Sequence, residues 1–256
     1  MEQIKITPDE ITVFVIESGE PSFKQALTAV NAQTYQTQVK IISNVTPMWK
    51  AFQQMLDLCE TPYFVQVDAD MILKPSAIET LATSFEKQDS SCCMYVGFLF
   101  DSDMDRNILG VKIYDHRVFK HFPYKESFSC EVFQLEQLKR FGYSYKVADL
   151  KSSTQESESL GKHSPSQTPE MAFSRWERNM LKYRSLGYDY LASYPKIMLD
   201  KVRSQPHNNI ALAQLLGCVS GLVCEMDIFR EVDASKKNEH FEILRKHLQI
   251  DTKSKT

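Results

Sequence analysis

The segment TPYFVQVDADMILKPSAIETL, residues 61–81, decides the fold class of this chain. It begins with an apolar run from Tyr63 to Val67, which is typical of a buried β-strand. The run is interrupted by Asp68 and Asp70, and apolar residues then resume. A buried carboxylate is costly unless a partner compensates its charge. The segment therefore predicts a core strand that ends in two carboxylates which need compensation.

Strand and helix patterns alternate around this segment. Continuous apolar, β-branched runs predict buried strands, and stretches with apolar residues on one helical face predict helices between them. The expected strands cover residues 11–16, 38–43, 63–67 and 92–100, and the expected helices cover residues 23–35, 47–59 and 76–88. This alternation predicts an α/β fold with a mainly parallel sheet that is flanked by helices on both faces.

The position of the two carboxylates suggests a site. In open α/β sheets, ligands bind in the crevice outside the carboxyl ends of the strands. Asp68 and Asp70 lie at such an end, and side chains two residues apart on an extended chain point the same way. Such a pair suits a hard divalent cation such as Mg²⁺ or Mn²⁺. The alternative interpretation is a solvated strand end with two surface aspartates, because the D-x-D pattern also arises by chance.

Composition limits the classes of protein. The 256 residues allow one sizeable α/β domain, or a domain with an appendage. The net charge of −3 and the pI of about 6.1 argue against a protein built mainly to bind nucleic acid. No signal peptide is visible, and the cysteines have no metal-binding spacing, so we expect reduced thiols in a cytoplasmic protein. The cysteines are Cys59, Cys92, Cys93, Cys130, Cys218 and Cys224.

An apolar stretch near the C-terminus, residues 210–224, is too short for a membrane-spanning helix. It is 15 residues long and contains Gln214, whereas a spanning helix needs roughly 20 apolar residues. Gly217 and Gly221 form a GxxxG pattern that favours close packing of a buried helix. A surface that touches lipid or a partner is the alternative, so peripheral contact with a membrane stays open.

Three motifs follow one another in a fixed order. AQTY at 32–35 ends a helix after the first strand and turn, and DAD at 68–70 precedes a proline and a helix. In SCEVFQLEQLKRFGYSYKV, residues 129–147, an acidic residue starts a helix that ends in a GY turn before a strand. This order resembles the nucleotide-sugar glycosyltransferases of the GT-A fold, particularly the large inverting group called family 2. The resemblance covers residues 10 to 150.

The resemblance implies an organisation and an activity. It implies a GT-A, Rossmann-like domain over residues 1–165 that binds a nucleotide sugar and carries the catalytic groups. Residues 164–256 show no family pattern, but helical length and apolar content predict a helical C-terminal region over 166–256, which we expect on the acceptor side. We expect residues 171–230 to be largely helical. The implied reaction moves one sugar from a nucleoside-diphosphate sugar to an acceptor hydroxyl with inversion. A divalent cation, Mn²⁺ or Mg²⁺, would stabilise the departing diphosphate.

The resemblance also implies a general base. Glu131 stands where the family's acidic base lies, at the start of a helix, and Glu136 is the second choice. The alternative for Glu131 is an acid that only interacts favourably with the helix dipole.

The ligands of the cation and of the donor follow from the same resemblance. Asp68 and Asp70 would hold the cation, with His163 from the polar loop 160–167 as a third ligand. The alternative for His163 is an exposed loop histidine. The expected residues for binding the nucleotide sugar are Ser18, Asn44, Lys50 and Asp68.

Two polar segments are predicted to be loops. Residues 101–112, DSDMDRNILGVK, begin like an EF-hand but have Arg106 where that loop needs glycine, so a solvated loop is expected. Residues 150–159, LKSSTQESES, are expected to form a mobile, substrate-gated loop.

Two other functions remain open at the level of sequence. One is a nucleotidyltransferase of related fold, although neither GxxxxGK nor GxGxxG is present. The other is a degenerate transferase-like domain that binds a sugar or a partner. The acceptor (a sugar, a lipid-linked molecule or a protein) and the oligomeric state stay open as well.

Overall fold

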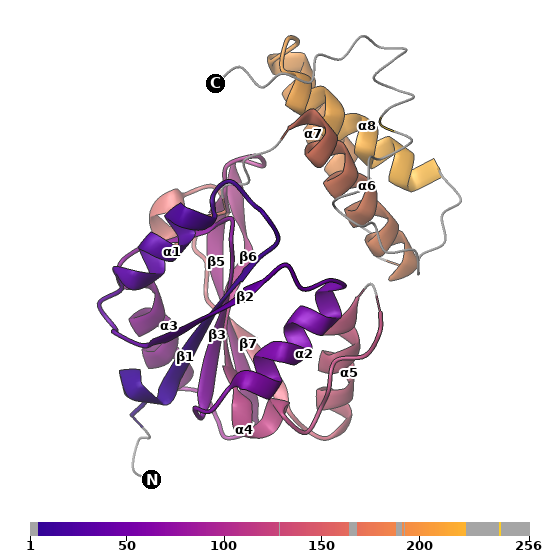
Figure 1. The fold of residues 1–256 in the computed structure, drawn as a ribbon. Coiled ribbons are helices and arrows are strands. Elements are labelled where there is room, and N and C mark those ends of the chain that lie inside the picture. The colour runs from indigo at the N-terminus through magenta and orange to yellow at the C-terminus, as the bar shows by residue number, and fades with distance from the viewer. Residues whose placement is uncertain are drawn as a thin grey trace. The chain divides into compact units, whose positions relative to one another are not determined.

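The computed structural model describes residues 5–127, 129–163, 168–187, 191, 193–223 and 241. The chain divides into two compact units, Met1–Ser166 and Gln167–Thr256, and Figure 1 labels most of their helices and strands. Each unit is described by itself.

The first unit is built on three neighbouring parallel strands. β1 (Ile11–Glu17) pairs with β2 (Gln38–Ser43) on one side and with β3 (Tyr63–Asp68) on the other. The helices α1 (Phe23–Asn31) and α2 (Met48–Leu58) connect these strands in turn. The strands and helices predicted for this part of the chain are confirmed to within a few residues at their ends.

Further strands extend the sheet beyond β3. The strand order is β2-β1-β3-β6-β5-β8-β4, with β7 paired to β5 as well. β6 runs antiparallel to both β3 and β5, whereas β7 and β8 run parallel to β5. The remaining elements of this unit are η1 (Pro8–Glu10), β4 (Met71–Leu73), α3 (Ala77–Phe85), β5 (Cys92–Asp101), β6 (Arg106–Asp115), α4 (His116–Phe119), α5 (Cys130–Arg140), β7 (Ser144–Val147), η2 (Glu156–Glu158) and β8 (Gly161–His163).

The predicted α/β class, a sheet flanked by helices, is confirmed, and the sheet is mixed. Its mixed character comes from a tight turn after β5, in which Asp101 Oδ1 accepts from the backbone N–H groups of Asp103 and Met104. This turn sends β6 back beside β5. The prediction of a solvated loop over 101–112 is wrong beyond the turn, because a strand begins at Arg106.

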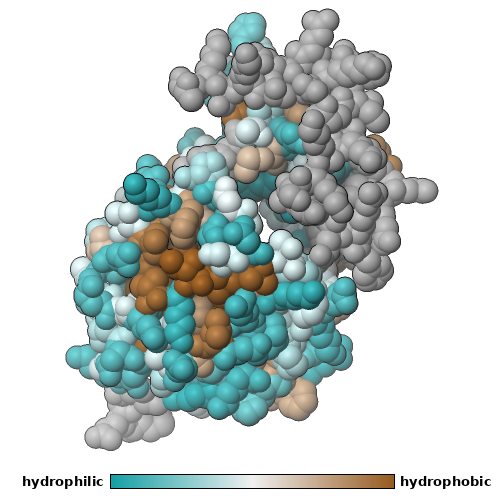
Figure 2. Space-filling model, in the orientation of Figure 1, coloured by the Kyte–Doolittle hydropathy of each residue, from teal (hydrophilic) through white to brown (hydrophobic). Residues whose placement is uncertain are grey.

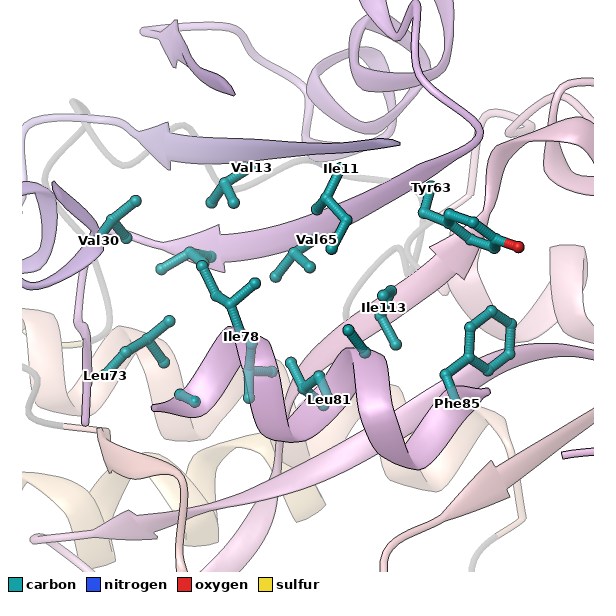
Figure 3. Close-up of a cluster of buried hydrophobic side chains, with 14 of the residues drawn as sticks. Ile11, Val13, Val30, Tyr63, Val65, Leu73, Ile78, Leu81, Phe85 and Ile113 are labelled. Atoms are coloured by element: carbon teal, nitrogen blue, oxygen red, sulfur yellow. The ribbon is translucent and has the colours of Figure 1, made fainter. Parts of the chain in front are cut away.

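Helices cover the two faces of the sheet with separate apolar layers. On the face covered by α1 and α3, Ile11 and Val65 from the strands pack against Ile78 and Leu81 from α3 (Figure 3). On the other face, Phe64 packs among apolar residues of α2, α4 and α5. Because side chains alternate along a strand, the even-numbered residues of β3 face α2 and α5.

The sheet ends on one side at β2, where apolar side chains are partly exposed. Ile41 of this edge strand is 46% exposed. Figure 2 shows an apolar patch in the region of α1 and β2, surrounded by polar residues.

The expected buried thiols are found in the described residues. Free, buried cysteines are Cys59, Cys92, Cys93, Cys130 and Cys218. Cys224 lies outside the described residues.

The second unit is helical where it is described. It contains α6 (Pro169–Ser185), α7 (Ser193–Ser204) and α8 (Asn209–Val223). The prediction of helices in residues 171–230 is confirmed for these elements, whereas 188–190, 192 and 224–230 lie outside the described residues.

Glycines allow α8 to approach α6 closely. A Cβ atom on Gly217 would lie 2.3 Å from the carbonyl oxygen of Phe173, and one on Gly221 would lie 2.4 Å from that of Glu177. The GxxxG pattern therefore packs helix on helix within this unit, as predicted. In the parts of the chain that the structure describes, no helix has both the length and the apolarity to cross a membrane.

Candidate active site

The carboxyl ends of the three parallel strands lie level with one another. Glu17 of β1 pairs with Ser43 of β2, and Ile16 of β1 pairs with Asp68 of β3. The backbone N–H of Asn44 donates to the carbonyl of Glu17 at 2.9 Å, which joins the loop after β2 to the end of β1. The sheet therefore has the edge at which ligands bind in open α/β folds.

The residues predicted to bind the donor nucleotide follow these strand ends. The hydroxyl of Ser18 donates to Glu20 at 2.7 Å, and Asn44 adopts a left-handed conformation with φ of 55°. The amino group of Lys50 lies 5.5 Å from the ring centroid of Trp49. In the described part of the chain, these contacts are local to each loop or helix start. They do not join the side chains into one cluster with Asp68.

Asp68 lies at the end of a hydrogen-bonded row on the face toward α2 and α5. Its Oδ1 accepts from Gln66 Nε2 at 3.1 Å, and Gln66 Oε1 accepts from the Tyr114 hydroxyl at 3.0 Å. Burial, and next the charge of Asp70, raise the pKa of Asp68 to about 6. The charge of Lys112 acts in the opposite direction but does not cancel these effects. A cation beside this carboxylate would relieve the cost of its burial.

Glu131 approaches the same site from α5. Lys112 stands opposite Gln66 in the β3–β6 ladder, and its amino group donates to Glu131 Oε1. Burial lowers the pKa of Lys112, but the charge and hydrogen bond of Glu131 and the charge of Asp68 raise it more, so the net shift is upward. Lys112 therefore stays charged and acts on both carboxylates.

The second choice of base lies farther along α5. Glu136 Oε1 accepts from Lys139 at 3.2 Å, and both side chains are half exposed. Glu131, in contrast, shares the charge environment of Asp68.

Asp70 belongs to a second group, together with a histidine. β4 begins directly after Asp70 and pairs antiparallel with β8, so that Met71 stands opposite His163. His163 Nε2 lies 3.1 Å from Asp70 Oδ2, and its Nδ1 lies 2.7 Å from Asp101 Oδ2. The expectation that His163 sits in a polar loop is wrong, because it is a buried residue of strand β8.

Asp70 and His163 could provide two ligands to a cation, with water and substrate phosphates as the others. Within the described ranges, no set of three or more His, Cys, Asp or Glu side chains is arranged to hold a metal ion. Asp70 Oδ2 and His163 Nε2 are 3.1 Å apart, which suits neighbouring positions around an octahedral ion with bonds of about 2.1 Å. Mg²⁺ commonly keeps water and binds one or two protein carboxylates together with substrate phosphates.

The AQTY motif has a structural role beside this site. The buried side chain of Gln33 donates to the carbonyl of Lys74 at 2.8 Å and accepts from the backbone N–H of Ile78 at 3.0 Å. The motif thereby ties the end of α1 to the segment that follows Asp70.

The predicted mobile segment is also bonded to this region. The amino group of Lys74 donates to the carbonyls of Glu156 and Ser159 at 3.0 and 2.6 Å. Asn107 Nδ2 donates to the carbonyls of Ser152 and Gln155. The segment 150–159 is therefore held by hydrogen bonds from Lys74 and from Asn107.

Sequence reasoning missed four residues of the site: Gln66, Asp101, Lys112 and Tyr114. Gln66 carried a signal, because it is an amide inside an otherwise apolar strand and stands two residues before Asp68. Lys112 and Tyr114 lie on β6, whereas the sequence pattern predicts a loop over 101–112 and no element directly after it. Asp101 was attributed to the same loop.

Comparisons with known proteins show no match in sequence and distant likenesses in structure. No protein-family model and no curated protein matches the chain. A mannosyltransferase from Pyrobaculum calidifontis in complex with GDP-Man and Mn²⁺ is similar at 10% identity and a TM-score of 0.48, over 95% of this chain and 82% of that one. The 4-diphosphocytidyl-2C-methyl-D-erythritol synthase from Anaerococcus prevotii is similar at 9% identity and a TM-score of 0.38, over 58% and 92%. At these scores the likenesses transfer no activity to this chain.

Proposed function

We propose that the chain is a glycosyltransferase. It moves one sugar from a nucleoside-diphosphate sugar to an acceptor hydroxyl, with inversion at the sugar carbon and with Mn²⁺ or Mg²⁺. The main support is the position of Asp68 at the carboxyl edge of the sheet, in a shared charge environment with Asp70, Lys112 and Glu131.

The carboxylates have the chemistry that donor binding requires. Asp68, Asp70 and His163 would hold the cation, which supplies positive charge for the diphosphate as it leaves. Ser18, Asn44 and Lys50 would bind the rest of the donor, since they follow strand ends at the same edge.

Glu131 would act as the general base. An acceptor hydroxyl is a weak nucleophile, and its O–H proton would pass to the Glu131 carboxylate as its oxygen attacks the sugar carbon. The hydrogen bond from Lys112 to Oε1 holds this carboxylate in place.

The chain would divide its work between residues 1–165, which bind the donor and carry the catalytic groups, and residues 166–256, which help to bind the acceptor. The acceptor is a sugar, a lipid-linked molecule or a protein. A lipid-linked acceptor would bring the chain to a membrane surface.

The proposal is tested by donor binding with and without the cation. Isothermal titration with a panel of nucleotide sugars should give Mn²⁺-dependent binding that Asp70→Asn abolishes while the fold is kept. Asp57→Asn is a matched control, because it removes one exposed carboxylate in the last turn of α2. This turn precedes the start of β3, at the opposite end of that strand from Asp68. Unchanged metal-dependent affinity in Asp70→Asn would contradict the proposal.

Product analysis separates the other functions. Glycosyl transfer releases a nucleoside diphosphate, whereas a nucleotidyltransferase transfers the nucleoside monophosphate part of a nucleoside triphosphate to its substrate and releases diphosphate. A binding domain turns over neither.

A further inference from the structure

We propose that Asp101 is a positioning residue that orients His163 for the cation, so that Nε2 of the ring points to the site beside Asp70. This inference rests on the proposed metal-dependent function. It adds a residue that neither contacts the donor nor binds the cation.

The carboxylate of Asp101 has a fixed direction. The residue is 2% exposed at the end of β5. Its Oδ1 accepts from the backbone N–H groups of Asp103 and Met104 at 2.9 and 2.8 Å. Because this turn holds one oxygen, the other oxygen, Oδ2, is directed at His163 Nδ1 at a distance of 2.7 Å.

This contact assigns the two nitrogens of the ring. An ionised carboxylate can only accept hydrogen bonds, so Nδ1 must carry the proton that it donates to Asp101. Nε2 faces the second carboxylate, Asp70 Oδ2, at 3.1 Å, so a cation that binds there takes the place of any proton on Nε2. When Nδ1 keeps its proton, Nε2 is the nitrogen that can offer a lone pair to a cation.

The backbone supports the same orientation. His163 pairs with Asp101 in the β5–β8 ladder and with Met71 in the β4–β8 ladder. β8 lies unusually close to β4, since a Cβ atom on Gly161 would be 2.4 Å from the carbonyl oxygen of Ile72. The pairing of β8 with β4 and β5 therefore fixes the position of the ring, and the contact with Asp101 fixes its rotation.

A purely structural clasp is the competing explanation. In that case, the contacts among Asp70, His163 and Asp101 would only join β4, β8 and β5. Both explanations predict some loss of stability when Asp101 is changed, so stability alone cannot separate them. The identity of the atom that faces Nδ1 can.

The substitution Asp101→Asn exchanges that one atom. The backbone N–H groups of Asp103 and Met104 require an acceptor, so the amide oxygen should face them and the NH₂ group should face His163. Nδ1 must then accept a hydrogen bond, which places the ring proton on Nε2 and blocks that nitrogen as a ligand. Loss of such an outer partner typically costs 10–100-fold in metal affinity.

The test uses Mn²⁺ with inorganic diphosphate, which supplies the phosphate ligands that the donor would give. It measures binding by calorimetry and the nitrogen hyperfine coupling of bound Mn²⁺ by pulsed electron paramagnetic resonance. The wild type should show a histidine coupling that His163→Gln removes. Asp101→Asn should lose the coupling and bind Mn²⁺ about 10–100-fold more weakly. Asp105→Asn is the control with the same charge change on the same turn. It should behave as the wild type, because Asp105 is exposed and has a positive φ that asparagine tolerates.

The outcomes distinguish this inference from the proposed function. Absence of Mn²⁺ binding to the wild type in the presence of diphosphate would overturn both. Normal affinity and an intact nitrogen coupling in Asp101→Asn would overturn the positioning role alone.

A measurement on the wild type covers the case in which Asp101→Asn does not fold. With ¹⁵N-histidine and ¹¹³Cd²⁺ as a diamagnetic stand-in, the coupling should connect cadmium to Nε2 of His163 while Nδ1 stays protonated. A coupling to Nδ1, or none to His163, would overturn the inference.

Discussion

Lys112 on β6 is ion-paired with Glu131 in the first turn of α5. The charge of Lys112 also acts on Asp68 at the end of β3, so the pair links the proposed base to the proposed cation site. A general base must be ionised before it can take a proton, and the ammonium group of Lys112 fixes the position of this carboxylate.

Glu131→Gln tests this role of the carboxylate. Glutamine keeps the size of the side chain but cannot accept a proton, so transfer should fall by about 10²–10⁴-fold. Donor binding should stay nearly unchanged, because Asp68 and Asp70 are intact. Steady-state transfer rates and donor titrations on the same variant measure both effects.

The helix-dipole interpretation predicts a different result for Glu131→Gln. It predicts a stability loss of about 0.3–1 kcal/mol with near-normal turnover. Loss of the Lys112 contact also affects stability, so the rate decides between the two. Glu136→Gln on the same helix is the control and should retain full transfer.

Because burial raises the pKa of Asp68, replacing its carboxylate should increase the stability of the fold by an amount that depends on pH. The folded pKa is about 6 and the ordinary value is 3.8, so the folded state holds this proton more tightly than the unfolded state. The destabilisation is absent below the ordinary pKa, grows between the two values, and is complete above the folded pKa. In metal-free protein, Asp68→Asn should therefore raise the free energy of unfolding by roughly 1–3 kcal/mol near neutral pH.

Urea unfolding with a chelator present checks this expectation. The gain in Asp68→Asn should largely disappear at about pH 4, where the wild-type carboxyl is protonated in the folded state. An equal gain at both pH values would contradict the pKa shift as its cause. Added Mn²⁺ should stabilise the wild type more than the variant.

The first half of the sheet could be predicted because its signals are local. The apolar runs of β1 and β3 are long enough to identify a buried strand, and the helices between them have clear apolar faces. β4 and β8 are three residues long, so periodicity cannot show them. β6 begins inside an acidic, turn-rich stretch that suggested a loop.

The site residues Lys112 and Asp101 could not be predicted, because their positions depend on strands that the sequence pattern does not show. The contact of Lys112 with Glu131 depends on the register of β6 against β3, which sequence periodicity does not give. Asp101 looked like a surface carboxylate because its neighbours Asp103 and Asp105 are acidic as well. Its burial depends on β8, which comes sixty residues later. Asp68, in contrast, could be predicted because it follows directly from a strong strand signal.

Gln33 should be needed for stability and not for chemistry. Gln33→Leu leaves the backbone N–H of Ile78 without its acceptor and the carbonyl of Lys74 without its donor from Gln33. A buried group without a partner costs about 1–3 kcal/mol, so the free energy of unfolding should fall by at least that much. Thr34→Ala removes an exposed contact with Glu79 and should cost less than about 0.5 kcal/mol. Equal stabilities of the two variants in urea would contradict this role.

The packing of α8 on α6 provides the last prediction. Alanine normally stabilises a helix relative to glycine by about 1 kcal/mol. In Gly217→Ala the sign should reverse, because the new Cβ would lie 2.3 Å from the backbone oxygen of Phe173, which cannot move without shifting α6. Val219→Ala, at an exposed position of α8, is the control and should leave stability nearly unchanged.

If residues 166–256 help to bind the acceptor, Gly217→Ala should reduce transfer to the acceptor, while the first unit retains its Mn²⁺-dependent donor binding. Thermal unfolding, donor titration and transfer rate on both variants measure these effects. Full transfer by a variant whose second unit has lost its helical signal would show that this unit is no acceptor platform.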